Sequence, residues 1–97
     1  MSRTDGQVRI EIDGESYVMH YDLNALCAIE DALGITIDQI ETRIGEGRMK
    51  DVRVIMWAGL LRHHPETTLH DAGALFGSAD AMRAMEEGLR ASFGTGD

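Results

Sequence analysis

The strongest constraint on the fold is a two-residue turn signal between two short segments of alternating polarity. The segment Val8–Ile12 alternates apolar and charged residues, which is typical of a half-buried β-strand. Asp13-Gly14 follows and favours a type I′ turn, because both central positions of that turn need positive φ. A return strand then reaches Tyr21. We therefore predict an antiparallel β-hairpin over residues 8–21.

A two-residue turn also fixes which residues lie opposite each other. Ile12 is predicted opposite Glu15, Ile10 opposite Tyr17, and Val8 opposite Met19. One face of the hairpin should then carry Val8, Ile10, Ile12, Tyr17, Met19 and Tyr21. A hairpin alone is marginal in water, so this face must pack on the rest of the chain. The two outer edges are either covered or available to a strand from a second copy or another partner.

Residues 22–93 carry the periodicity and capping signals of four to five short helices. Asp22 is a candidate N-cap and Gly34 a stop for a helix over residues 23–33. Its inner stripe would be Leu23, Leu26, Ile29 or Glu30, and Leu33. The run Thr36–Gln39 resembles a capping box that opens a second helix, which we expect to end at Gly45. We predict that Gly45-Glu46-Gly47 is a flexible joint.

The third predicted helix, from about Lys50 to His63, is apolar almost all round and should be the most buried element. Gly59 inside it suggests the close approach of a neighbouring backbone. Pro65 ends this helix, and Thr68 with Asp71 opens a fourth, which Gly77 should close. Ser78 would cap a fifth helix. Its apolar stripe, a candidate partner-binding surface or ordinary core, is Met82, Met85, Leu89 and Phe93.

These elements predict one α+β domain over residues 1–97, with a two-stranded hairpin packed on a bundle of four to five short helices. Residues 1–7 and 94–97 are expected to be disordered. The chain has 97 residues and a net charge of −8, which disfavours binding to nucleic acid or to anionic membranes. The single cysteine excludes an intramolecular disulfide. With no apolar stretch at the N-terminus, we expect a cytoplasmic protein.

The charge is unevenly distributed along the chain. Residues 42–62 contain five basic and two acidic side chains, between two acidic segments. This basic segment could contact an acidic partner, contact another copy head to tail, or form a solvated helix start.

Candidate catalytic and metal-binding residues do not combine into a credible site. His63, His64 and His70 crowd one inter-helix segment but lack the spacing of a zinc motif. Cys27 has neutral or acidic helical neighbours, so its thiol is not activated. The adjacent carboxylates Glu30 and Asp31 point to different sides of their helix. We therefore expect a protein that is not an enzyme, with no cofactor and no small-molecule substrate.

Two sequence blocks resemble a known family. The first is the run Leu23-Asn24-Ala25-Leu26-Cys27 with Ile29-Glu30. The second is Trp57-Ala58-Gly59-Leu60, followed by His64-Pro65 and Thr68-Leu69. Together with the hairpin they resemble the tail assembly chaperones of gene transfer agents and related phages, a family that is also labelled as tail tube proteins. The resemblance covers residues 8 to about 76.

This resemblance implies a role in tail morphogenesis inside the bacterial cell that makes the particle. Such a chaperone binds the tape measure protein and helps to recruit tail tube subunits, so these two proteins are the expected partners. A homo-oligomer is a further expectation. Two alternatives remain open: a structural tail component such as a tube subunit, and a small acidic regulator or inhibitor of a basic protein.

Overall fold

The computed structural model describes residues 7–75 and 79–93, and these form an α+β fold. The elements in chain order are β1 (Gln7–Ile12), β2 (Glu15–His20), α1 (Leu23–Leu33), the 3₁₀-helix η1 (Ile37–Gln39), α2 (Ile40–Glu46), α3 (Met49–Leu60), α4 (Leu69–Leu75) and α5 (Ala79–Phe93). The predicted hairpin followed by a helical bundle is confirmed. Residues 1–7 were expected to be disordered, but Gln7 begins β1, where it pairs with His20. Residues 1–6 and 94–97, the Gly77 stop and the Ser78 cap lie outside the described residues.

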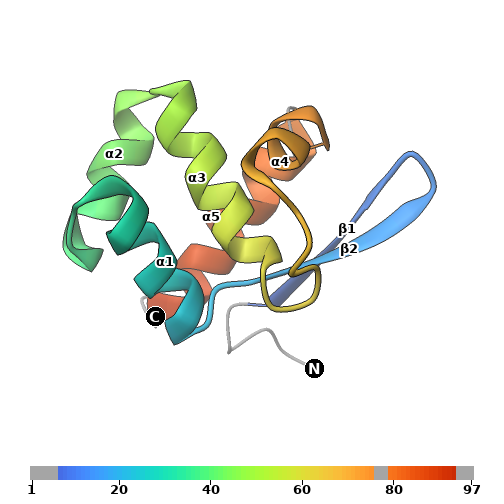
Figure 1. Ribbon diagram of the computed structural model, residues 1–97, viewed down its shortest axis with the longest axis horizontal. Coiled ribbons are helices and arrows are strands. Elements are labelled where there is room, and N and C mark those ends of the chain that lie inside the picture. The colour runs from blue at the N-terminus through green and yellow to red at the C-terminus, as the bar shows by residue number, and fades with distance from the viewer. Residues whose placement is uncertain (1–6, 76–78, 94–97) are drawn as a thin grey trace.

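The hairpin has the predicted register. Ile12 pairs with Glu15, Ile10 with Tyr17, and Val8 with Met19. Asp13 (φ 54°) and Gly14 (φ 83°) both adopt the left-handed conformation that the turn requires. The tip of the hairpin projects away from the helices, whereas its base reaches into them (Figure 1).

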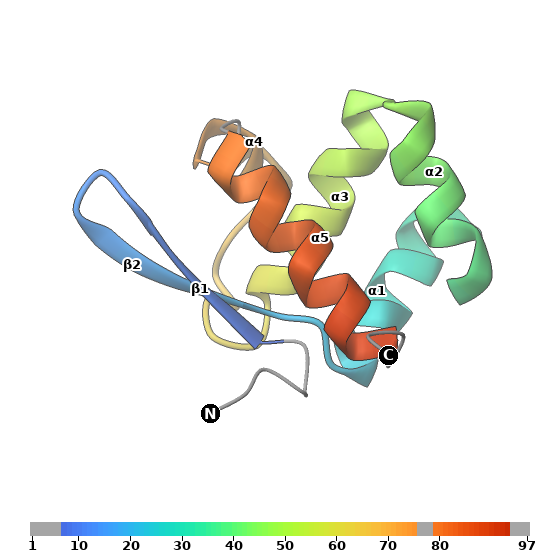
Figure 2. The same cartoon turned by 180° about the vertical axis from the view of Figure 1, so that it is seen from behind.

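Helix α3 is the centre of the molecule. It packs against α1, α2, α4, α5 and strand β2, and eight of its twelve residues are buried. Helix α5 also packs on the hairpin, mainly on β1 (Figure 2). The apolar residues Val8, Ile10 and Met19 of the hairpin are buried in the core to which α3 and α5 contribute.

Side-chain caps begin three of the described helical elements, at the predicted residues Asp22, Thr36 and Thr68. Asp22 accepts a hydrogen bond from the N–H of Ala25 at 2.9 Å, and Gly34 ends α1 with φ 68°. The Thr36 N–H donates to Oε1 of Gln39 at 3.0 Å in a capping box. A reciprocal pair of hydrogen bonds between Thr68 and Asp71 opens α4.

The predicted ends of the second and third helices were wrong. Gly45 lies inside α2, and the left-handed residue that stops this helix is Gly47 (φ 74°). The segment 45–47 is therefore a helix end and not a flexible joint. Helix α3 stops at Leu60, and turns reach Pro65 from there.

Two predicted packing positions also differ from the structure. Leu23 was placed in the inner stripe of α1 but is 69% exposed, and Ala25 is buried in its place. Gly59 is closely approached, although by a side chain and not by a backbone. A Cβ at Gly59 would lie 2.6 Å from Cζ of Tyr21, whose fully buried ring rests on this glycine.

Tyr21 joins the hairpin to the helices through polar contacts as well. Its side-chain hydroxyl donates to the carbonyl oxygen of Ile55 in α3 at 2.8 Å. Its main-chain carbonyl accepts a hydrogen bond from the hydroxyl of Ser92 in α5 at 2.7 Å. Burial raises the pKa of the Tyr21 hydroxyl well above its usual value, so this group stays protonated.

Candidate functional site

The candidate partner site is a surface groove between α2 and α5, and we call it the α2–α5 groove. Its volume is about 290 Å³. The apolar part of its lining comes from Ile44 and Leu89, and the charged part from Glu41, Glu86 and Arg90. Gly45 adds no side chain, and among the described residues no atom beyond the adjacent backbone of its own helix lies within 4 Å of the position that its Cβ would occupy. An apolar strip flanked by charges suits a small amphipathic segment of another protein.

The predicted partner-binding stripe of the last helix meets this groove at one residue. Leu89 lines the groove but is 3% exposed, and Met85 is fully buried in the core. Met82 is half-buried against the same core. Phe93 ends α5, and its side chain lies outside the described part of the chain. Contact of Met82, Met85, Leu89 and Phe93 with a partner remains a prediction.

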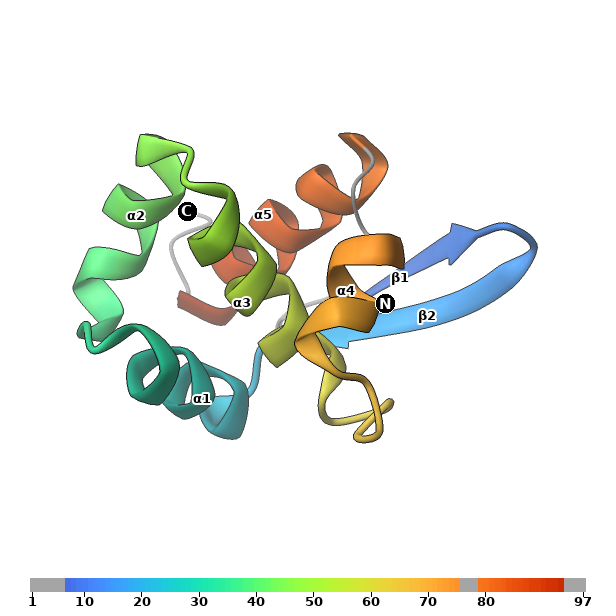
Figure 3. The same ribbon diagram turned by 45° about the horizontal axis from the view of Figure 1, so that its top comes forward.

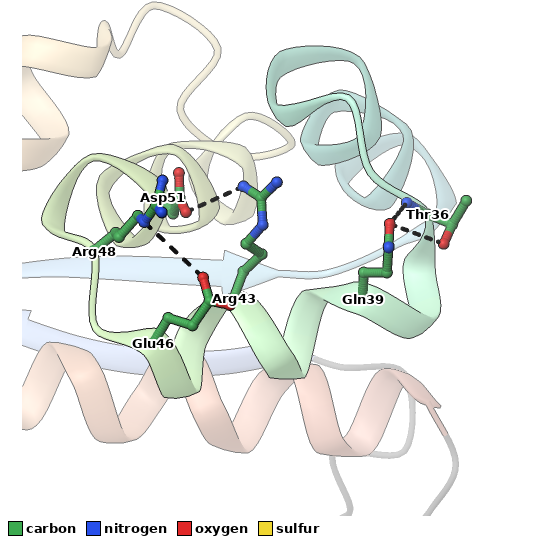
Figure 4. A network of polar contacts seen from close by, with 6 residues as sticks. All are labelled: Thr36, Gln39, Arg43, Glu46, Arg48 and Asp51. Atoms are coloured by element: carbon green, nitrogen blue, oxygen red, sulfur yellow. Dashed lines mark hydrogen bonds and ion pairs between the residues drawn. The ribbon is translucent and has the colours of Figure 1, made fainter.

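Beside the groove, an ion pair that was not predicted from the sequence links α2 to α3. Arg43 donates to Oδ2 of Asp51 at 3.2 Å, and the Asp51 side chain is only 9% exposed (Figure 4). A nearly buried carboxylate needs such a partner. The only sequence signal for this pair was an acid in the first turn of a helix that is apolar over most of its length.

Other basic side chains of segment 42–62 also have acidic neighbours within the chain. Arg48 lies 4.0 Å from Glu46 (Figure 4), and Arg62 lies 3.3 Å from Asp22. These pairs account for much of the segment's positive charge. Lys50 and the end of Arg48 are exposed and remain accessible to a partner.

A second pocket lies between β2 and the segment that leads into α4. Its volume is about 430 Å³, and three of its lining residues are acidic: Glu15, Glu66 and Asp71. The Tyr17 ring meets the His64 ring there at a centroid distance of 5.3 Å. Burial, and then the neighbouring Glu15 carboxylate, raise the pKa of the Tyr17 hydroxyl.

A third pocket, of about 490 Å³, lies at the start of α1. His63 lines it and stacks on His20 with a centroid distance of 5.8 Å. Burial and the neighbouring His20, Arg62 and His64 lower the pKa of His63, while Asp22 opposes the shift. The burial of His20 was not predicted, because alternation places His20 on the polar face of the hairpin.

The remaining candidate catalytic and metal-binding residues lie apart from one another. Among the described residues, no group of three or more His, Cys, Asp or Glu side chains could hold a metal ion. His63 and His64 contact different rings of the hairpin, and His70 is exposed on α4. Cys27 and Asp31 are exposed on α1, and Glu30 is half-buried. No helix in the described part of the chain is long and apolar enough to cross a membrane.

Fold and sites together define a small α+β protein whose surface offers shallow grooves of mixed polarity. The family described as "Phage tail tube protein, GTA-gp10" matches this chain over residues 5–95. The chain therefore belongs to this family of phage and gene transfer agent tail proteins, and the match extends through the last helix. No curated protein and no solved structure matches the chain.

Proposed function

We propose that this protein is a tail assembly chaperone, which binds the tape measure protein of its particle and helps to recruit tail tube subunits onto it. The proposal is of a binding role without catalysis. The α2–α5 groove is the feature that carries it. Tape measure proteins, as the resemblance implies, are long and helical and aggregate readily, so a chaperone must cover apolar helix surface.

The chemistry of the groove supports this choice of partner. Half-buried Ile44 presents apolar surface beside Leu89, which is almost fully buried, and both lie between charged rims. This arrangement matches one face of an amphipathic helix. Acidic residues predominate over the whole chain, with 17 Asp and Glu against 9 Lys and Arg. This charge keeps a complex with an aggregation-prone partner soluble.

The family description favours a second candidate, a subunit of the tail tube. A tube subunit is expected to build rings through extended β-structure. Within the described residues the chain forms two strands of six residues each, and helices make up most of the rest. The small amount of β-structure is the reason that we prefer the chaperone.

Co-expression with the tape measure protein of the same genome tests the proposal. We expect a soluble complex on affinity capture and sizing, with the tape measure protein insoluble when expressed alone. Ile44→Asp places a charge in the groove at a half-buried position and should abolish capture. Leu23→Asp is the matched control, because it changes an exposed apolar helix residue that lies outside the groove.

The outcomes separate the candidates. Rings or tubes formed by the protein alone, together with its presence in finished particles, would support the tube subunit. Capture that disappears at high salt and is indifferent to Ile44→Asp would favour the small acidic regulator of a basic protein. Circular dichroism of both variants must match that of the parent protein, so that loss of binding is not loss of fold.

A further inference from the structure

The two outer edges of the hairpin are not equivalent. In a two-residue turn, the Ile12 carbonyl accepts a hydrogen bond from the Glu15 N–H. From this pair onward, residue pairs that are hydrogen-bonded across the two strands alternate with pairs that are not. The main-chain groups of Arg9 and Glu11 therefore point outward from β1. Those of Ser16 and Val18 point outward from β2.

The β2 edge is covered at Val18. The outward N–H of Val18 donates to Nε2 of His64 at 3.4 Å, and the His64 ring contacts Tyr17. The segment that carries His64 is held to α3, because the Trp57 indole N–H donates to the carbonyl of Thr67 at 3.0 Å. Figure 3 shows this segment and α4 beside β2.

The β1 edge has no such cover among the described residues. Arg9 and Glu11 are exposed, and no described residue outside the hairpin forms a hydrogen bond to their main chain. An open strand edge pairs readily with another strand.

We propose that this edge binds the β1 edge of a second copy, as an antiparallel strand pair with Ile10 at the two-fold axis. Hydrogen bonds between two strand edges need main-chain groups that point outward on both strands. In the alignment centred on Ile10, Arg9 of each copy therefore lies opposite Glu11 of the other copy. Each pair joins opposite charges directly across the strands, which is the stabilising arrangement.

Neighbouring registers lack this complementarity. A shift of two residues in one direction sets Arg9 against Arg9, and a shift in the other direction sets Glu11 against Glu11. The central register also places half-buried Ile12 opposite Val8 of the second copy, on the apolar face. The charges thus select this alignment, and the apolar residues are compatible with it.

The shape of the molecule permits the pairing. β1 starts at the helical body and ends at the projecting tip (Figures 1 and 2). Antiparallel alignment therefore sends the two helical bodies to opposite ends of the shared strands. The result is a four-stranded sheet in the order β2-β1-β1-β2.

Sedimentation equilibrium of the purified full chain at concentrations up to about 1 mM tests the proposal. Salt of about 0.15 M screens the net charge of each copy beyond about 8 Å but leaves adjacent pairs in place. We expect a dimer. Arg9→Glu and Glu11→Arg should each weaken it by about tenfold or more, because two attractive pairs become repulsive.

The double variant Arg9→Glu with Glu11→Arg restores opposite charges and should restore the dimer. It also keeps the net charge at that of the parent, so bulk repulsion does not explain the rescue. Asp31→Arg, at an exposed position of α1, makes the same change in net charge as Glu11→Arg; it is the control and should leave the dimer unchanged. Amide hydrogen exchange at Arg9 and Glu11 should slow as the concentration rises.

A monomer at all concentrations would overturn the proposal, as would a dimer that is indifferent to both charge reversals. A monomer that gains protection at Arg9 and Glu11 only with the tape measure protein would assign the edge to a different occupant. Capture of the tape measure protein does not depend on this dimer. A failure of dimerisation therefore does not contradict the proposal that the α2–α5 groove binds the tape measure protein.

Discussion

The hairpin junction and the α2 corner attach to the same helix, α3, by different means. At the junction, the Tyr21 ring is fully buried against Gly59 and bonded to Ile55. At the corner, α2 buries Ile40 in the core and is also held by the ion pair between Arg43 and Asp51. Close packing tolerates little change of volume, whereas an ion pair with one partly hydrated partner tolerates more. The corner that borders the candidate groove is therefore the more adaptable of the two regions.

The largest effect is expected from the same substitution made in both regions. Gly59→Ala places a Cβ 2.6 Å from the Tyr21 ring, and we expect a loss of about 2–3 kcal/mol in the free energy of unfolding. Gly45→Ala meets open space in α2, and it should raise the free energy of unfolding by about 0.5–1 kcal/mol. Urea unfolding followed by circular dichroism measures both.

A second substitution shows whether the contact with the ring causes the loss. In a Tyr21→Leu background, Gly59→Ala should cost much less, because the shorter side chain leaves room for the Cβ. An equal cost in both backgrounds would mean that the ring and the glycine are not coupled.

An intermediate effect is expected at the corner. Asp51→Ala removes the carboxylate that pairs with Arg43 and should lower the free energy of unfolding by about 1 kcal/mol. The loss is smaller than at the junction, because the Arg43 side chain is 31% exposed and can be hydrated. If Asp51→Ala cost as much after Arg43→Ala as before it, the ion pair would contribute nothing.

The smallest effect concerns pH at the hairpin side. The pKa of His63 is lowered in the folded protein, so the unfolded chain binds the proton more tightly. The contribution of His63 to stability is therefore present above pH of about 6.5 and is lost as pH falls below it. The melting temperature should fall from pH 7.5 to pH 5.5, and the fall should be smaller in His63→Gln. If the melting temperature depended on pH equally in both proteins, His63 would not contribute to this dependence.

The elements that the sequence predicted well are those set by neighbouring residues. The register followed from Asp13-Gly14 and the alternation around it, and the start of α1 followed from Asp22. These signals act over a few residues, so no knowledge of the tertiary fold is needed.

The errors concern contacts between distant segments. The neighbour of Gly59 is a ring 38 positions earlier in the chain, and His20 is buried because His63 stacks on it. Leu23 is exposed despite its apolar character, because α1 turns another face to α3. The α2–α5 groove was likewise foreseen only through Leu89, since its two walls are separated in sequence.

The hydrogen bond from Val18 to His64 has a consequence for the size of any assembly built on the hairpin. A subunit with two open edges can add copies at both and grow into a fibre. A subunit with one edge capped has only one place to add a neighbour, and a two-fold pair uses it on both sides. His64 would then limit the assembly to two copies, because the shared sheet has no further open edge at which it could grow.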